Sequence, residues 1–258
     1  MAEERCAQAR RRGVSVLVCG GLSLKADTIQ ESMPFALFDG GGHYLGVGEP
    51  VRCDERLGRM PEERLRKELL AMAEADEALR VRLGAEGVLS GGYHPEMRAL
   101  HARHAARLSS ILEVHGWPSK AEVGADGQSA AWLILQHSID HPDLMRTGLR
   151  RLREPPACTE VDAARVAMLE DRIHVLEGHP QRFGTQHDWD EDGMMSPLAV
   201  ADPARVDALR ESVGLPPLGE QTRELRERAA AEGQKPPASY LEYQRESEEW
   251  ARGAGWRA

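Results

Sequence analysis

The sequence lacks the motifs that most directly identify a biochemical activity. It contains no CxxC pair, no GxGxxG or GxxxxGK[ST] phosphate loop and no GxSxG nucleophile elbow. No apolar run approaches the roughly 20 residues of a membrane-spanning helix. These absences disfavour a disulfide scaffold, a P-loop nucleotide site and a serine hydrolase, and we expect no membrane partner.

Basic residues are also in deficit. The chain has 33 lysines and arginines against 42 acidic residues, a net charge of −9, which disfavours binding to the phosphates of a nucleic acid. Its four cysteines are widely scattered and read as free thiols of a reducing compartment, so we expect a cytoplasmic protein. Arginines 10–12 before an apolar stretch resemble the start of an export signal, but Glu3 and Glu4 precede them and no cleavage site follows.

Composition and patterning divide the 258 residues into three parts. Residues 1–58 read as a small, β-hairpin-like extension or a partly disordered one, with short strands at Val14–Val18, Pro34–Phe38 and Tyr44–Val47. Residues 60–218 read as a helical core domain. Residues 219–258 read as a charged, helical C-terminal tail.

The core domain carries apolar residues at helical spacing. Leu65, Leu69 and Met72 begin the stripe of a first helix after Pro61. His94-Pro95 opens a second helix that Gly116 should cap. Further helices are expected from 142 to 153, from 160 to 177 with Thr159 as the cap, from 204 to 213, from 221 to 232 and around 240–250.

Residues 129–139 form the most apolar segment of the chain. At about 100° per residue their apolar side chains cover almost the whole helix circumference, and a helix that is apolar all round is a buried one. We therefore predict a mainly α fold, a multi-helix bundle around this central helix, in which Trp132 and Leu133 are nearly inaccessible.

Several polar residues interrupt apolar helix faces in this domain, where an unpaired polar group is costly. Asp76 lies in the stripe of the first helix, with Arg80 at a spacing that allows the two side chains to pair. Histidines lie on the core-facing sides of the second and central helices, and a loop rich in amides and hydroxyls follows the helix of Asp171 and Arg172. The candidate site residues are Asp76, Arg80, His101, His104, His137, Asp171, Arg172, Gln181, Thr185 and Gln186.

The chain resembles a bacterial family of domains of unknown function from about Pro61 to Leu218. The matching segments are LLAMAEADEALR, RLSSILEVHGWP, VG followed by SAAWLILQH, LEDRIHVLEGHPQRFGTQ and DPARVDALRESVGLPPL. The resemblance implies that Asp76, Arg80, His137, Asp171, Arg172, Gln181, Gly184, Thr185 and Gln186 occupy motif positions. The chain departs from the family at His101 and His104, where acidic or amide residues are expected, and at Phe183, where tyrosine is usual. The resemblance carries no chemistry.

Three functions remain open at this point. In the first, a small-molecule enzyme uses His137 as a general base, Asp171 or Asp76 orients its ring, and Arg172 or Arg80 holds an anionic substrate group. Second, the same charges form a buried ion-pair network in a non-catalytic module that binds a ligand or a protein. A third interpretation is a metal-dependent hydrolase in which His137 and His141, four residues apart, bind one ion.

The first interpretation is the most economical one. It predicts that His137, Asp171, Arg172 and the loop 181–186 line one pocket, that Asp76 reaches into it, and that His101 and His104 complete it. The expected partner is a small-molecule ligand. The sequence leaves the cofactor, the reaction and any protein partner unassigned, and this interpretation includes no metal.

Overall fold

The protein divides into two compact units, Met1–Arg59 and Met60–Ala258. The computed structural model of the chain describes residues 16–17, 36–38, 44–47, 62–88, 93–155 and 157–258. Within these ranges the first unit contributes strands and the second contributes the helices and one hairpin.

The first unit contains a three-stranded antiparallel sheet in the order β1-β2-β3. The strands are β1 (Val16–Leu17), β2 (Ala36–Phe38) and β3 (Tyr44–Val47). Val16 pairs with Leu37, and Ala36 pairs with Val47. Each strand lies within a segment that the sequence predicts as a strand. The sequence also predicts a turn at the three glycines 40–42, which lie outside the described residues.

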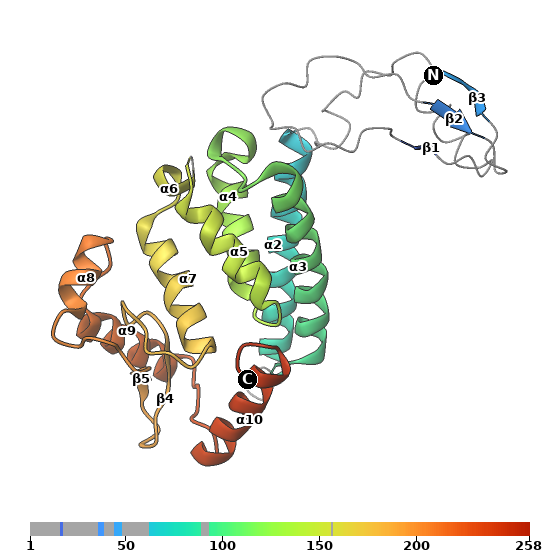
Figure 1. Cartoon of the computed structure of the whole chain (residues 1–258). Coiled ribbons are helices and arrows are strands. Elements are labelled where there is room, and N and C mark those ends of the chain that lie inside the picture. The colour runs from blue at the N-terminus through green and yellow to red at the C-terminus, as the bar shows by residue number, and fades with distance from the viewer. Residues whose placement is uncertain (1–15, 18–35, 39–43, 48–61, 89–92, 156) are drawn as a thin grey trace. The chain divides into compact units, whose positions relative to one another are not determined.

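The second unit is mainly helical, as predicted (Figure 1). Its helices are α2 (Glu62–Ala85), α3 (Pro95–His115), α4 (Lys120–His137), α5 (Pro142–Arg153), α6 (Ala157–Glu160), α7 (Ala163–Leu176), α8 (Val206–Ser212), α9 (Leu218–Ala231) and α10 (Tyr240–Gly253). In Figure 1 the long helices α2 and α3 run side by side, and both contact α4.

Local sequence signals explain where the core helices begin and end. The His94 side chain accepts a hydrogen bond from the Glu96 amide at 3.3 Å, and the helix ends at Gly116, whose φ of 72° suits glycine. Ser119 and Glu122 form a reciprocal capping box at the start of α4. The predicted start and end of the second helix are therefore confirmed.

The central helix is buried mainly on one side. It packs against α2, α3 and α5, and Ala131, Ile134 and Leu135 are at most 2% exposed. Trp132 and Leu133 are only partly buried, so the prediction that both are nearly inaccessible is wrong. The Trp132 indole instead donates to the Arg165 carbonyl at 3.3 Å, and its ring lies 5.3 Å below the Arg165 guanidinium.

Gly148 marks a close approach of α5 to α4. A Cβ atom at this position would lie 2.4 Å from Cδ2 of the fully buried Leu135, well inside the normal carbon–carbon separation of about 3.5–4.0 Å. We expect Gly148→Ala to lower the free energy of unfolding by about 1–3 kcal/mol, although alanine is the better helix former. Urea unfolding measures the change. Gly219→Ala in α9, where the new Cβ meets nothing within 4 Å, is the control, and equal stability of the two variants would contradict the expectation.

The helix predicted from 160 to 177 corresponds to α7, which begins three residues later, at Ala163. Residues 157–160 form the single turn α6, and the chain then bends before α7 begins at Ala163. Asp162, rather than Thr159, caps α7, because its side chain accepts a hydrogen bond from the Ala164 amide at 3.1 Å. Aspartate and threonine are both good caps, so the sequence offers two competing starts and the structure uses the second.

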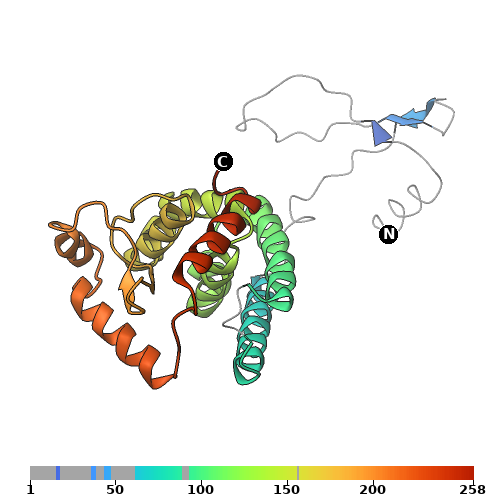
Figure 2. The ribbon, with the colours of Figure 1, turned by 90° about the horizontal axis from the view of Figure 1, so that it is seen from below.

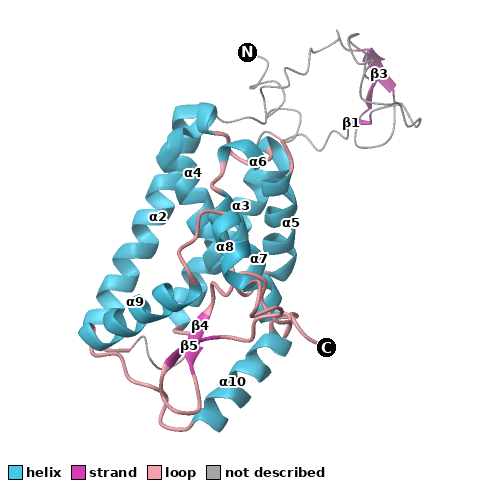
Figure 3. Cartoon of the chain, turned by 90° about the vertical axis from the view of Figure 1, so that its left-hand side faces the viewer, coloured by secondary structure: helices cyan, strands magenta, loops and turns pink. Residues whose placement is uncertain are grey.

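A short hairpin follows α7, where the sequence predicts a loop. Its strands are β4 (His187–Trp189) and β5 (Met195–Pro197), paired antiparallel with Asp188 opposite Ser196. Figure 3 shows the hairpin between α9 and α10. Contacts between α9 and β5 and a 2.7 Å hydrogen bond from the Tyr243 hydroxyl to Asp188 hold it there.

The C-terminal segment packs closely on the bundle. Viewed from below, α10 lies across the ends of the bundle helices (Figure 2). The Trp256 indole is 4% exposed and donates to the Ile139 carbonyl at 2.6 Å, while the Trp250 indole donates to Asp140 at 2.9 Å. This segment therefore contributes to the same apolar core as α2 to α7.

Candidate active site

One buried carboxylate joins three helices of the bundle. Asp76 of α2 is 2% exposed, and its Oδ2 atom lies 2.7 Å from Nε2 of His101 on α3 and 2.9 Å from Nδ1 of His137 at the end of α4. The two imidazole rings are tilted against each other with centroids 5.2 Å apart. We call Asp76, His101 and His137 the Asp76 group.

The hydrogen bonds of the Asp76 group assign its protons. The Tyr93 hydroxyl lies 2.6 Å from Nδ1 of His101 and can donate to it, which leaves His101 to donate from Nε2 to Asp76. His137 then donates from Nδ1 to the same oxygen. Because neutral imidazole has one N–H, the Nε2 atom of His137 keeps a free lone pair. His137 retains 18% of its side-chain surface, and within the described residues Nε2 has no hydrogen-bond partner.

Electrostatics favour this proton arrangement. Burial opposes ionisation of Asp76, but the hydrogen bonds from His101 and His137 outweigh it and hold the pKa of this carboxyl well below its usual range. Burial lowers the pKa of His137, although its hydrogen bond to Asp76 acts in the opposite direction. The site therefore contains an ionised carboxylate beside a neutral, basic imidazole at neutral pH.

Two buried atoms, one of them in the Asp76 carboxylate itself, have no hydrogen-bond partner in the described part of the chain. They are Oδ1 of Asp76 and Nδ1 of His104. Burial lowers the pKa of His104, while the charge of Asp76 raises it. An unsatisfied carboxylate oxygen in the interior is costly, so the Asp76 group has capacity to bind a further proton donor or a cation.

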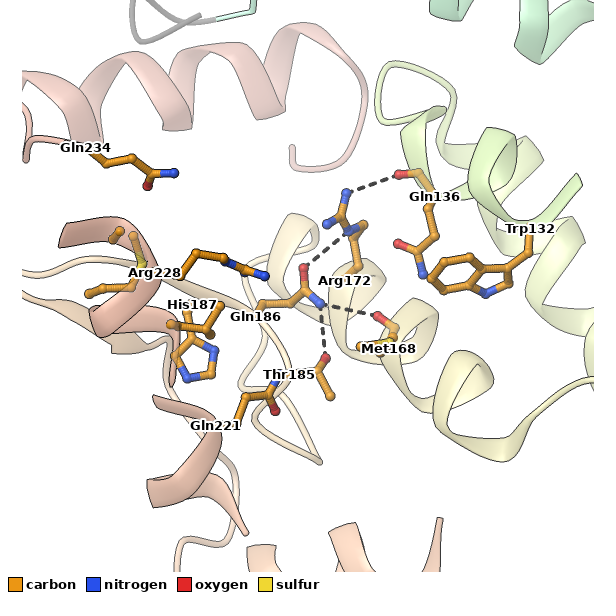
Figure 4. A pocket seen from close by; sticks show the side chains of 13 residues that line it. Trp132, Gln136, Met168, Arg172, Thr185, Gln186, His187, Gln221, Arg228 and Gln234 are labelled. Atoms are coloured by element: carbon orange, nitrogen blue, oxygen red, sulfur yellow. Dashed lines mark hydrogen bonds between the residues drawn. The ribbon is translucent and has the colours of Figure 1, made fainter. Parts of the chain in front are cut away.

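A second polar feature adjoins the Asp76 group along α4. It is a cavity of about 390 Å³, which we call the Arg172 pocket after the arginine at its centre (Figure 4). Its walls come from α4, α7, the loop after α7, the β4–β5 hairpin and the segment from α9 to Gln234. The lining residues are Trp132, Gln136, Met168, Arg172, Thr185, Gln186, His187, Met195, Gln221, Leu225, Arg228, Ala229 and Gln234.

Arg172 connects the pocket to the end of α4. Its Nε donates to the Gln186 side-chain oxygen at 3.2 Å, and one terminal nitrogen donates to the Gln136 carbonyl at 3.1 Å. Gln136 directly precedes His137 in the chain. Gln186 is fixed in turn, because its side-chain Nε2 donates to the Thr185 hydroxyl at 3.0 Å and to the Met168 carbonyl at 3.4 Å.

Asp171 has a different role from the one that the sequence suggests. Its side chain is fully buried and accepts hydrogen bonds from the backbone amides of Arg182, Phe183 and Thr185 at 2.7–3.1 Å, and from the Thr185 hydroxyl at 3.0 Å. Asp171 therefore holds the loop after α7. Asp76, not Asp171, contacts and orients the His137 ring.

The loop 181–186 is closed by further buried groups. The Gln181 side chain donates to the carbonyls of Gln186 and Leu198 and accepts from the Gln186 amide, all at 2.8–2.9 Å. Arg210 of α8 is fully buried and donates to the Phe183 carbonyl at 2.7 Å and to the Pro216 carbonyl at 2.6 Å. Gln181 is therefore a structural residue of the loop, and Arg210 is one that the sequence analysis missed.

The structure thus distributes the predicted site residues over neighbouring features. Asp76, His101 and His137 meet in one group, Arg172, Thr185 and Gln186 line the pocket, and Asp171 and Gln181 hold the loop. Arg80 is exposed and forms no ion pair with Asp76 in the described residues, where the two histidines contact Oδ2 of that carboxylate instead. Its charge acts on both His137 and Arg172, which places Arg80 near both features.

His137 and His141 do not lie on one continuous helix. The i, i+4 argument requires one continuous helix, but α4 ends at His137, and Ser138 caps it with a ψ of 41°. His141 begins α5 after a turn. Within the described residues, the grouping of ligand-type side chains is instead Asp76, His101 and His137, with ligand atoms within 4.8 Å of one another.

Other polar residues of the site had weak sequence signals. Tyr93 follows a glycine loop and lies next to the helix cap, so nothing in the pattern connects it with His101. Gln221 and Arg228 lie on α9, which reads as a charged, solvated helix. Only the position of a polar side chain on an otherwise apolar face identified candidates, and these three residues are not on such a face.

Comparisons with known proteins add a family but no chemistry. The model of a family described as a family of unknown function (DUF6624) matches residues 63–234. No curated protein and no solved structure matches the chain. Every helix in the described part of the chain is too short or too polar to cross a membrane.

Proposed function

The chain belongs to DUF6624, a family of unknown function, and we propose from its own residues that it is a small-molecule enzyme in which His137 acts as a general base. The observation that carries the proposal is the Asp76 oxygen shared by two imidazoles, of which His137 keeps an accessible Nε2 lone pair. A basic nitrogen that a buried carboxylate orients through the opposite ring nitrogen is the arrangement that general-base catalysis requires.

Each member of the group has a definite part in this mechanism. The Nε2 atom of His137 removes a proton from the bound substrate, and the ring becomes an imidazolium. Asp76 stabilises that positive charge through Nδ1–H and remains ionised, because its pKa lies far below that of the ring. His101, which Tyr93 fixes in turn, is a positioning residue that holds Asp76 in place. Return of the proton from Nε2 to product completes the cycle.

A purely structural network is the main competing interpretation. An ion pair between Asp76 and Arg80, four residues apart on α2, would satisfy the carboxylate within one helix. The chain uses two histidines from other helices instead, and Asp76 Oδ1 remains without a partner in the described residues. A structural network is expected to satisfy its buried atoms, whereas sites of reaction commonly do not.

The proposal is tested by incubating the protein with a mixture of cellular metabolites and following their consumption by mass spectrometry. We expect His137→Gln to slow the conversion that the native chain catalyses by about 10²–10⁴-fold without loss of the folded state. His179→Gln is the matched control, since His179 has a largely exposed side chain and should leave the rate unchanged. Equal rates for His137→Gln and the native chain would refute the proposal.

A metal-dependent hydrolase is the second candidate function, and a specific observation favours it. Asp76, His101 and His137 are the ligand types of catalytic zinc sites and provide three ligand atoms within 4.8 Å. A divalent ion held by them would supply a Lewis acid and a bound water of lowered pKa. Metal analysis of the purified protein tests this candidate. Stoichiometric metal that is lost in His101→Gln supports it, and the general-base proposal requires full activity after chelation.

A further inference from the structure

Arg172 carries a charge that no acidic residue neutralises. In the described part of the chain its hydrogen bonds go to the neutral oxygens of Gln136 and Gln186, and it forms no ion pair. Burial, together with the nearby charge of Arg80, lowers the pKa of this guanidinium to about 10. The group is still protonated at neutral pH, so a partly buried cation faces the cavity without a counter-ion, an arrangement that costs free energy unless an anion is bound.

The rest of the pocket lining has the same bias. The lining residues include two arginines, four glutamines, a threonine and a histidine, but no aspartate or glutamate. This absence is notable in a chain with 42 acidic residues. Burial lowers the pKa of His187, so this ring is neutral near pH 7. Figure 4 shows the Arg228 side chain directed towards Gln186 from the opposite wall.

Apolar side chains also line the pocket. Trp132 lies on the far side of Arg172 from Arg228 (Figure 4), and the other apolar lining residues are Met168, Met195, Leu225 and Ala229. Trp132 is only partly buried, so it can contact a ligand. The volume of about 390 Å³ lies within the roughly 300–1,000 Å³ range of small-molecule sites. A bare inorganic anion would make no contact with these apolar side chains.

We propose that the Arg172 pocket binds a small organic anion, with a carboxylate or phosphate group on Arg172 and Arg228 and an apolar or aromatic body against Trp132. The inference rests on the proposed function, since the anion is then the substrate of the neighbouring His137. Arg172 contacts the carbonyl of Gln136, the residue before His137, so an anion anchored there lies beside the end of α4 that carries the base. Arginine suits this role because its planar guanidinium hydrogen-bonds carboxylate or phosphate with two N–H groups.

The test is a titration of the full chain with three probes, followed by NMR at the Trp132 indole and the Gln186 side-chain amide. Phenyl phosphate and benzoate share an aromatic body and differ in the anionic group, and benzyl alcohol is the neutral counterpart. We expect at least one anion to bind about tenfold or more tightly than benzyl alcohol, which corresponds to one charge-assisted hydrogen bond. The stronger of the two anions identifies the substrate class as phosphate or carboxylate.

Variants locate the binding. Arg172→Gln should lower the affinity for the preferred anion by about tenfold or more. Arg228 is exposed, so Arg228→Gln should lower this affinity by roughly two- to fivefold. Arg205→Gln, which removes the same charge from an exposed position outside the pocket, should change the affinity less than twofold. If Arg172→Gln does not fold, because Arg172 also ties α4 to the loop, Arg228→Gln still decides the matter.

Equal binding of the neutral and charged probes, or unchanged anion binding in Arg228→Gln, would overturn the inference. The outcome is separable from that of the proposed function. His137→Gln should bind the anion within about twofold of the native chain, since His137 does not line the pocket. If His137→Gln loses turnover and the native chain binds none of the anions, the general-base proposal stands and only the proposed substrate class is refuted.

Discussion

Replacing Asp171 with alanine is expected to lower the free energy of unfolding by about 3–5 kcal/mol, the range for removal of one partner from a buried charged network. The fully buried side chain satisfies three backbone amides and one hydroxyl of the loop 182–185. Alanine leaves these donors inside the protein without an acceptor, and each unsatisfied buried donor costs about 1–3 kcal/mol. Partial opening of the loop to water limits the total.

Urea unfolding monitored by circular dichroism measures this loss. Asp143→Ala is the matched control, because the Asp143 side chain is fully exposed and forms a 3.6 Å ion pair with Arg146 at the surface. The control should stay within about 0.5 kcal/mol of the native chain. A loss below 1 kcal/mol in Asp171→Ala would show that the loop does not depend on this carboxylate.

Replacing Asp76 with asparagine should reduce turnover by about 10²–10⁴-fold. Asparagine has nearly the same size as aspartate, but it is neutral and its amide can donate as well as accept. It cannot stabilise an imidazolium, and it allows His137 to carry its proton on Nε2, where no base remains. The equivalent change in a Ser-His-Asp triad costs about 10⁴ in kcat through the wrong tautomer.

Two readouts separate this effect from simple destabilisation. Nitrogen NMR of the imidazoles should show the His137 proton on Nδ1 in the native chain and a change of tautomer in Asp76→Asn. The acidic limb of the pH dependence of turnover should move to lower pH, because the hydrogen bond and charge of Asp76 raise the pKa of His137 and asparagine removes that effect. Asp140→Asn, which alters a carboxylate bound to Arg98 and Trp250 instead, is the control. Turnover in Asp76→Asn within tenfold of the native rate would exclude Asp76 as the group that orients the base.

Most of the helical architecture can be predicted from apolar spacing and caps, and the failures have identifiable causes. The C-terminal half of α4 is apolar all round, yet Trp132 and Leu133 are only partly buried. Hydropathy does not reveal that an apolar side chain such as Trp132 lines a cavity. The start of α7 was predicted three residues early, because both Thr159 and Asp162 are suitable caps. The β4–β5 strands are three residues each and too short to show an alternating pattern.

The candidate site was predicted in part, for a physical reason. A polar residue on an apolar helix face identified Asp76, His101 and His137, and burial is indeed what brings these three together. The same criterion selects Asp171, because an acidic residue that accepts backbone amides and one that orients a histidine have the same pattern in the sequence. Whether the carboxylate holds a loop or orients a histidine depends on which helix ends lie next to each other. Contacts between residues far apart in the chain determine that arrangement.

The docking of the C-terminal segment also sets an order of events during synthesis. The Trp256 indole binds the carbonyl of Ile139, a residue 117 positions earlier. At about 5–20 residues per second a ribosome needs roughly 6–23 s to cover that interval. Throughout this delay Ile139 and the neighbouring Asp140 lack Trp256 and Trp250, although α2, α3 and α4 have already been synthesised. The nascent bundle thus presents an open end for seconds, which is long compared with helix formation and long enough for a chaperone to bind there.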